Sequence, residues 1–341
     1  MNQEKLTHTA QAMAAPGKGI LAADESSGTI KKRFDAIGVE STEQTREAYR
    51  NMLFATAGME NHISGVIMFD ETVRQGTADG TPFPAYLAAR GVQPGIKVDR
   101  GAKPLAGHPG ETVTEGLDGL RERLTEYAAM GLTFAKWRAV ITIGDGIPSQ
   151  TCIDSNAEAL ARYAALCQEA GIVPIVEPEV LMDGSHTMGR CREVTGQTLG
   201  AVFATLTAHR VYLPGIILKP NMVVAGTDCP DQPSSAEVAR RSLELLLAIV
   251  PADVPGIAFL SGGQTERQAT ANLQAMNAIA DIDKPWRLTF SYGRALQQSA
   301  LQRWSGNSDQ LPAGQAAFLH RAEMNAAATS GRYSEALETG S

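Results

Sequence analysis

The sequence has few cysteines and lacks the short motifs typical of metal and nucleotide sites. Its four cysteines, Cys152, Cys167, Cys191 and Cys229, form no CxxC pattern, which indicates reduced thiols in place of a zinc site or a disulfide framework. The six histidines never fall at HxxH or HxxxH spacing, and neither GxGxxG nor GxxxxGKS/T follows a predicted strand. We therefore expect neither a metal nor a cofactor.

Long apolar runs are also missing. The longest, at 245–250, is far shorter than the roughly 20 residues of a membrane-spanning helix. The first residues contain no apolar core of a signal peptide. The net charge of −7 argues against a general surface for nucleic acid or acidic membranes. These absences predict a soluble cytoplasmic protein with neither nucleic acid nor membrane as its partner.

What the sequence does contain is a regular alternation of apolar runs and amphipathic segments. Hydrophobic residues make up 43% of the chain and charged residues 20%, as in ordinary globular proteins. Helical spacing separates most of the runs, although 76–95 is rich in glycine and proline. Eight such units favour a single (β/α)₈ TIM barrel over a doubly wound sheet. The eight predicted strands are 20–23, 64–69, 95–99, 133–138, 172–177, 215–218, 256–260 and 287–291.

No change in composition marks a linker, so we predict one domain over residues 1–341. A helical extension at 6–15 precedes the barrel, which we place at about 19–304. A C-terminal helix and a short tail occupy about 312–341.

Polar residues recur where these strands end. Side chains two apart on a strand share a face, and active sites of such barrels lie at the C-terminal strand ends. We therefore expect these residues to converge on one pocket, although each could simply begin a solvated loop. The residues are Asp24, Lys97 with Asp99, Lys136 with Arg138, Glu177 with Glu179, and Lys219 with Asn221.

Lys219 is the candidate covalent catalyst. It lies between the apolar run 215–218 and Pro220, which prevents the strand from continuing. Crowding by Lys136 and Lys97 would disfavour the ammonium form of Lys219 and leave a neutral amine. Such an amine attacks a ketone to form an imine, which withdraws electrons while the neighbouring carbon–carbon bond breaks. The plainer interpretation is a solvated lysine that opens a loop.

Imine chemistry also needs groups that move protons. Glu177 and Asp24 are placed to act as acid or base, and Lys136 would stabilise negative charge on oxygen.

Two segments indicate phosphate binding. Ser261-Gly262-Gly263 closes the seventh strand and Tyr292-Gly293-Arg294 closes the eighth. Glycines there let backbone N–H groups approach an anion, and arginine offers a bidentate contact, although a lone Gly-Gly is equally a tight turn. A second anion site could form from Ser26, Thr29 and Lys97. A substrate with a phosphate at each end is suggested.

Seven segments, in order along nearly the whole chain, resemble class I fructose-bisphosphate aldolase. They are Leu21–Ser26, Gly95–Asp99, Phe134–Arg138, Pro174–Glu179, Leu218–Met222, Phe259–Gln264 and Phe290–Leu296.

The resemblance implies a TIM barrel, a homotetramer and metal-free cleavage of fructose 1,6-bisphosphate to dihydroxyacetone phosphate and glyceraldehyde 3-phosphate, in glycolysis and gluconeogenesis. By resemblance Lys219 is the Schiff-base lysine, Glu177 the main acid/base and Asp24 the carboxylate at the C4 hydroxyl. Lys136 resembles the lysine that assists charge at the reacting centre, and Glu179 a residue that supports the lysines.

The resemblance also divides the phosphate contacts into two groups. Those of the C1 phosphate correspond to Ser261, Gly262, Gly293 and Arg294, next to Gly263. Those of the C6 phosphate correspond to Ser26, Thr29, Lys97 and Arg138, and Arg33 matches a further cation near phosphate. Thr29 replaces the more usual serine and keeps the hydroxyl.

One departure concerns the C-terminus. Family members from animals end in a longer tail, whose terminal tyrosine assists proton transfer on the enamine, whereas this sequence stops at Glu338-Thr339-Gly340-Ser341. We expect Tyr333 to be structural and another group, or water, to handle that proton. Two alternatives stay open: a Schiff-base or transaldolase-like enzyme for another phosphosugar, such as sedoheptulose 1,7-bisphosphate, and a non-catalytic barrel that serves as a binding or scaffold protein.

Overall fold

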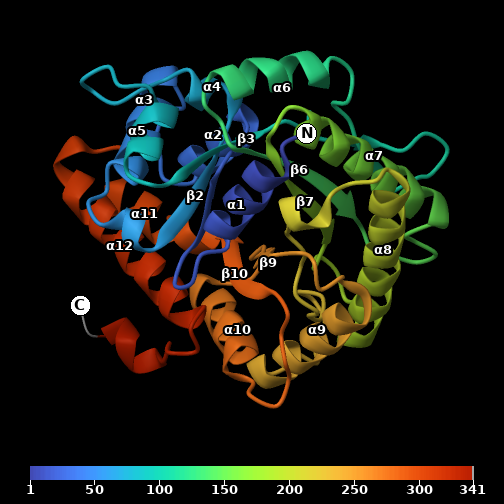
Figure 1. Cartoon of the computed structure of the whole chain (residues 1–341). Helices are drawn as coiled ribbons and strands as arrows, with labels where there is room; N and C mark the ends of the chain where they lie inside the picture. The colour runs from blue at the N-terminus through green and yellow to red at the C-terminus, as the bar shows by residue number, and fades with distance from the viewer. Residues whose placement is uncertain (340–341) are drawn as a thin grey trace.

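The computed structural model describes residues 1–339, and its parallel strands close into a barrel (Figure 1). Around the barrel the strands follow the order β1-β10-β9-β8-β7-β6-β3-β2. The predicted TIM barrel is confirmed. The strands are β1 (Gly19–Ala23), β2 (Ile63–Met68), β3 (Gln93–Lys97), β6 (Phe134–Ile141), β7 (Val173–Val180), β8 (Ile217–Leu218), β9 (Gly256–Phe259) and β10 (Arg287–Tyr292).

Helices surround the barrel, and α1 lies across one of its ends (Figure 1). Most longer helices begin at a serine or threonine whose hydroxyl accepts a backbone N–H, as Ser234 does from Glu237 ahead of α9. The helices are α1 (Gln3–Met13), α2 (Ser27–Asp35), α3 (Glu43–Phe54), α4 (Asp70–Val73), α5 (Phe83–Ala89), α6 (Leu120–Ala129), α7 (Gln150–Glu169), α8 (Met188–Ala208), α9 (Ser235–Ile249), α10 (Glu266–Ala278), α11 (Arg294–Trp304) and α12 (Leu311–Ala328).

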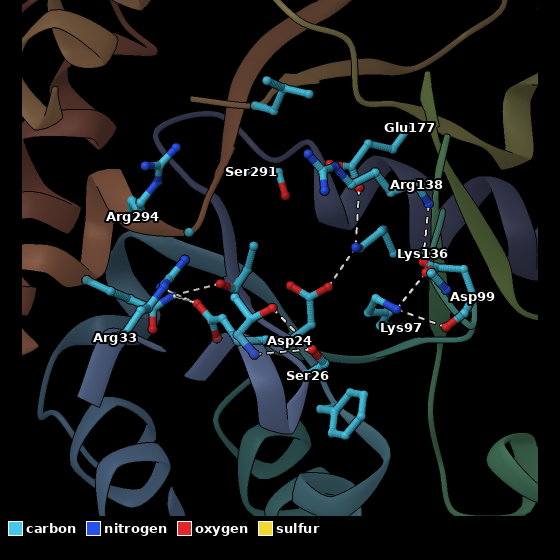
Figure 2. Close-up of a pocket in the computed structure, with 18 of the residues that line it drawn as sticks. Asp24, Ser26, Arg33, Lys97, Asp99, Lys136, Arg138, Glu177, Ser291 and Arg294 are labelled. Atoms are coloured by element: carbon cyan, nitrogen blue, oxygen red, sulfur yellow. Dashed lines mark hydrogen bonds and ion pairs between the residues drawn. The ribbon is translucent and has the colours of Figure 1, made fainter. Parts of the chain in front are cut away.

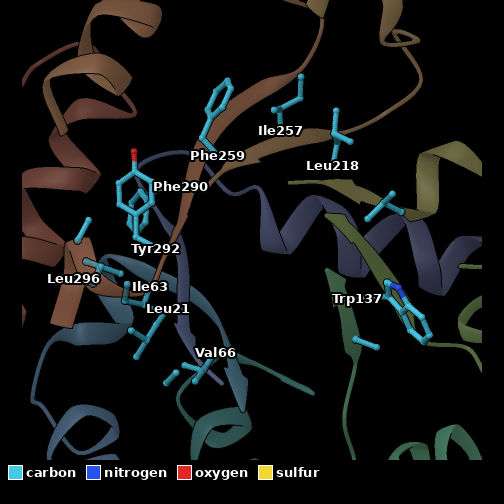
Figure 3. Packing of buried hydrophobic residues seen from close by; sticks show 14 of the residues in the cluster. Leu21, Ile63, Val66, Trp137, Leu218, Ile257, Phe259, Phe290, Tyr292 and Leu296 are labelled. Atoms are coloured by element: carbon cyan, nitrogen blue, oxygen red, sulfur yellow. The ribbon is translucent and has the colours of Figure 1, made fainter. Parts of the chain in front are cut away.

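The strands are apolar along their length because both of their faces are covered. In β1, Ile20 and Ala22 belong to the cluster shared with α1, whereas Leu21 and Ala23 belong to the large cluster shared with the surrounding helices. Figure 3 shows part of this larger cluster, including Leu21. The alternation places successive residues of each strand on opposite faces, which decides which side chains reach the barrel interior.

Phe134 fills the N-terminal half of the barrel where small residues leave room for it. A Cβ added to Gly95 would lie 2.2 Å from the Phe134 ring, and one added to Gly65 would lie 3.1 Å from it. Alanine at residue 95 would therefore overlap the ring.

Helix α1 closes the N-terminal end of the barrel. Its side chains Leu6, Ala10 and Met13 have no exposed surface and pack with the interior residues of the strands. The Ser64 hydroxyl donates a hydrogen bond of 2.6 Å to the Met13 carbonyl, which ties the helix to β2.

The strand boundaries differ from the predicted ones by up to three residues, and β3, for example, covers Gln93–Lys97 where 95–99 was predicted. The strand before Lys219 has only two residues, because Leu213–Gly215 forms a 3₁₀ turn. Strands β6 and β7 run on to Ile141 and Val180 by pairing with each other, and the prolines of β7 do not end it.

Two short strands and one helix were absent from the prediction. A hairpin of β4 (Ala102–Pro104) and β5 (Thr112–Thr114) follows β3, and helix α2 follows β1. The two strands are only three residues long and half polar, and α2 offers only the pair Ile30 and Phe34 at i and i+4, so the hydrophobic signal in both places is weak. Helix α7 begins at Gln150, with Ser149 as its cap.

The grouping of residues 1–341 into one domain stays a prediction. The short C-terminal segment ends in the 3₁₀ turn Glu335–Thr339, and Gly340 and Ser341 lie outside the described residues. Among the described residues, none of the helices has the length and apolar character needed to cross a membrane.

Candidate active site

A cavity of about 1260 Å³ opens at the C-terminal ends of the strands. It brings together every predicted site residue except Gly263 and Asn221. The lining includes Asp24, Ser26, Thr29, Arg33, Lys97, Lys136, Arg138, Glu177, Glu179, Lys219, Ser261, Gly262, Gly293 and Arg294.

Lys219 is fixed directly after the short strand β8. Its N–H donates to the Val176 carbonyl at 2.8 Å, which extends the pairing with β7 by one residue and directs the side chain into the cavity. The residue is only 4% exposed. Asn221 does not join it there, because its amide binds the Val180 N–H and the Thr195 hydroxyl.

Four charged side chains form an alternating row at the base of the cavity. Lys136 Nζ lies 2.7 Å from Asp24 Oδ2 and 3.5 Å from Glu177 Oε2. The other oxygen of Glu177, Oε1, lies 3.2 Å from Lys219 Nζ. Figure 2 shows Lys136 between the carboxylates of Asp24 and Glu177. Glu177 therefore lies within ion-pair distance of both lysines, although its Oε2 has no hydrogen-bond partner among residues 1–339.

Lys219 was expected to be crowded by other lysines, but its amine pairs with the carboxylate of Glu177. Glu177 contacts both Lys219 and Lys136, while Lys97 donates to the Asp99 carboxylate at 2.6 Å. Buried ammonium groups require nearby carboxylates to offset their lost hydration, so opposite charges alternate. Residue spacing along the strands did not reveal this pairing.

The charges of this row stabilise one another. Burial alone would raise the pKa of Asp24, but the positive charges of Lys136, Lys219 and Lys97 lower it from 3.8 to about 2. Burial likewise opposes the charged form of Lys136, but Asp24 and Glu177 raise the pKa of Lys136 well above its ordinary value. Asp24 and Lys136 are thus held as an ion pair at neutral pH.

This ion pair predicts a specific dependence of stability on pH. Because the pKa of Asp24 is lower in the folded state than the ordinary 3.8, folding favours ionised Asp24. Its contribution, about 2 kcal/mol, is complete above about pH 5 and is lost as the pH falls through about 4 to 2. Urea unfolding between pH 6 and pH 3 should show a shallower loss of stability in Asp24→Asn than in the wild type; parallel curves would contradict this.

A second layer of charges surrounds the row. Arg138 forms an ion pair with Glu179. The predicted role of Glu179, support of the lysines, therefore stays a prediction, since its carboxylate pairs with this arginine. At the start of α2 the Ser26 and Thr29 hydroxyls lie 3.1 Å apart.

The N-terminus of α11 offers the other anion-binding surface. Arg294 is its first residue, and its guanidinium donates to the Gly262 carbonyl at 2.6 Å. The loop after β9 and the start of α11 therefore meet, and the free N–H groups at the helix start favour an anion. Gly263 lies outside this surface, with its N–H 2.9 Å from Met182 Sδ.

Ser291 is a candidate that the sequence reasoning missed. It lines the cavity from β10, is 1% exposed, and its hydroxyl has no hydrogen-bond partner among residues 1–339. A buried hydroxyl without a partner is costly unless a ligand or water satisfies it. Its position one residue before Tyr292-Gly293-Arg294 was the available signal.

Comparisons with known proteins agree with this geometry. The family model of class I fructose-bisphosphate aldolase matches residues 5–341. The probable class 1 fructose-bisphosphate aldolase of Xanthomonas campestris is 55% identical over 98% of this chain and 99% of its own length. Cytosolic fructose-bisphosphate aldolase 5 of Arabidopsis thaliana is 53% identical, over 97% of this chain and 92% of that protein.

A solved structure gives the same result. The fructose-bisphosphate aldolase of Plasmodium falciparum superposes with a TM-score of 0.95 at 46% identity, covering 97% of this chain and 96% of that one. The fold, the lyase class and the activity implied by the resemblance are therefore confirmed. The chain belongs to the class I fructose-bisphosphate aldolases, which cleave fructose 1,6-bisphosphate.

Proposed function

We propose that the chain cleaves fructose 1,6-bisphosphate through an imine on Lys219, with Glu177, Asp24 and Lys136 as its proton-handling and charge-stabilising groups. The observation that carries this assignment is the buried row Asp24–Lys136–Glu177–Lys219 at the base of the cavity. It places an amine, a proton carrier in contact with that amine, and a second carboxylate within one connected set.

Imine formation uses Glu177 and Lys219, at one end of this row. Lys219 Nζ attacks the C2 ketone, and the resulting carbinolamine must lose water. Glu177, 3.2 Å from Lys219 Nζ, accepts the proton released by the amine and returns it to the departing hydroxyl. Lys136, on the other oxygen of Glu177, stabilises the negative charge that builds up on oxygen.

Bond cleavage uses Asp24, at the other end of the row. Asp24 accepts the proton of the C4 hydroxyl as the C3–C4 bond breaks, and the bonding electrons move into the imine to give an enamine. Because its pKa is about 2, Asp24 is a weak base. We infer that the proton moves together with cleavage, when the growing charge on the C4 oxygen supplies the driving force.

The two anion-binding surfaces select a substrate with a phosphate at each end. Arg294 and the Gly262 loop meet at one side of the cavity, whereas Lys97 and Arg138 line the other side (Figure 2). We assign the C1 phosphate to the Arg294 side and the C6 phosphate to Lys97 and Arg138, together with Ser26 and Thr29.

Borohydride trapping tests the covalent step directly. With dihydroxyacetone phosphate present, reduction of the imine should fix one three-carbon adduct on Lys219, located by peptide mass spectrometry. Borohydride without the ketone is the control. An adduct on another lysine, or none in a folded protein, would refute the assignment.

Removal of metal ions is expected to leave activity unchanged, because the imine acts as the electron acceptor. Cleavage should be the same after dialysis against EDTA as before it, in a coupled assay. Activity lost with EDTA and restored by a divalent ion would contradict this mechanism. Comparing kcat/KM for fructose 1,6-bisphosphate and sedoheptulose 1,7-bisphosphate would decide between the two sugars.

We also propose that the chain acts as a homotetramer in the cytoplasm. Tetramers are typical of the family that the sequence resembles, and the Arabidopsis relative is named as cytosolic.

A further inference from the structure

Glu25 is a buried acid that none of the steps above uses. It directly follows Asp24, and its side chain is 5% exposed. Its carboxylate forms ion pairs with Arg33 and, at 2.7 Å, with Arg50 Nη2, and it accepts a hydrogen bond of 3.1 Å from Gln297 Nε2. Three elements, α2, α3 and α11, therefore contact one side chain.

The two arginines keep this acid ionised. Burial alone would raise the pKa of Glu25, but the guanidinium charges of Arg33 and Arg50 lower it below its ordinary value. Arg50 is itself buried, with 3% of its side chain exposed, whereas Arg33 is 22% exposed and lines the cavity. Glu25 thus joins an interior cation to one at the cavity wall.

Gln297 fixes the position of this acid from the other side. Its amide nitrogen donates to the Ala22 carbonyl at 2.7 Å as well as to Glu25. Its amide oxygen accepts from the Tyr49 hydroxyl at 3.1 Å and from Arg50 at 3.4 Å. With both ends of the amide occupied, Glu25 has a single defined position between β1 and α11.

Arg33 occupies a place that needs such a counter-charge. Its Nη2 lies 3.8 Å from the position that a Cβ would take on Gly293, immediately before α11. Figure 2 shows Arg33 on the same side of the cavity as Arg294. A helix N-terminus and a second guanidinium both repel a cation, so without Glu25 the Arg33 side chain would turn away into solvent.

We propose that Glu25 is a positioning residue that holds the Arg33 guanidinium beside Gly293 and Arg294, so that two arginines bind the phosphate adjacent to the imine carbon. The inference rests on the proposed function, because it takes that end of the cavity as the C1-phosphate end. It follows that Glu25 governs binding of the ketone product and leaves binding of the aldehyde product unchanged.

Condensation kinetics test this selectivity. In Glu25→Gln, KM for dihydroxyacetone phosphate should rise about tenfold, the effect of losing one charge-assisted contact. KM for glyceraldehyde 3-phosphate and kcat should stay within about twofold. Glu60→Gln is the matched control. Glu60 lies in the turn before β2, at the end of the barrel opposite the cavity, and forms an ion pair with Arg90. Equal rises in both KM values would overturn the proposal.

A double variant separates positioning from a general loss of stability. If Glu25 acts through Arg33, Glu25→Gln should add no further rise in KM to that of Arg33→Ala. Independent, multiplying effects would overturn the proposal. If Glu25→Gln does not fold, Glu25→Asp replaces it, because the shorter acid keeps the buried charge yet cannot span both arginines; the same selective rise is expected, and unchanged KM values would refute it.

Failure of the positioning role of Glu25 can be distinguished from failure of the proposed function. Borohydride trapping on wild-type Lys219 reports on the imine alone. If borohydride traps the adduct in the wild type but the Glu25 variants have wild-type kinetics, only the positioning role of Glu25 is refuted.

Discussion

Replacing Lys219 by arginine is expected to abolish cleavage while leaving the fold intact. A guanidinium keeps the positive charge opposite Glu177 but cannot form the imine. The loss in kcat should be on the order of 10⁶-fold, the scale found when a covalent nucleophile is removed. A coupled assay for the triose products measures it, and borohydride with dihydroxyacetone phosphate should leave no adduct.

The matched control for this variant is Lys5→Arg. Lys5 is an exposed residue of α1, at the end of the barrel opposite the cavity. The control should retain wild-type kinetics. Turnover retained by Lys219→Arg, at an unchanged melting temperature, would reject Lys219 as the imine-forming residue.

Replacing Asp24 by asparagine is expected to separate the two halves of the reaction. The amide cannot accept the C4 proton, so cleavage of fructose 1,6-bisphosphate should fall about 10³-fold. Imine formation depends on Glu177 and Lys219, which do not contact Asp24 directly. Borohydride should therefore still trap dihydroxyacetone phosphate on Lys219, at a rate within about tenfold of the wild type.

The opposite pattern would contradict this division of roles. If Asp24→Asn lost trapping and cleavage equally, Asp24 would act on imine formation or on the charge of Lys136. Asp35→Asn is the matched control, because Asp35 forms an exposed ion pair with Lys31 at the end of α2, and its kinetics should be unchanged.

The fold and the convergence of the candidate site residues on one cavity could be predicted because the strands of a barrel carry a periodic signal. Lys219 directly follows an apolar run, whereas Lys136 and Glu177 lie inside β6 and β7. Both continue the series of interior positions that begins with Phe134 in β6 and with Val173 in β7, so the alternation along each strand directs them into the barrel. Gly263 shows the limit of this argument. It shares the Gly-Gly turn with Gly262, yet its N–H faces Met182, because a φ of 54° at Gly262 turns the chain between them.

Other features depend on contacts between distant segments. Glu25 pairs with Arg50 and Gln297, which lie 25 and 272 residues away along the chain, and no local pattern reports such partners. The alternation of lysines and carboxylates has the same origin, because side-chain packing selects which oxygen faces which ammonium. The hairpin of β4 and β5 is short and half polar, so it lacks the apolar run that reveals a buried strand.

The closure of the barrel by α1 determines where substrate enters the cavity and where the products leave it. Leu6 and Met13 are completely buried against the interior, so among residues 1–339 that end offers no passage. Substrate must enter and both products must leave through the same mouth. In the proposed mechanism the aldehyde product is held by non-covalent contacts alone, whereas the ketone product is still bonded to Lys219. That mechanism therefore predicts that the aldehyde leaves first, and that a new sugar binds only after hydrolysis has released the ketone from the lysine.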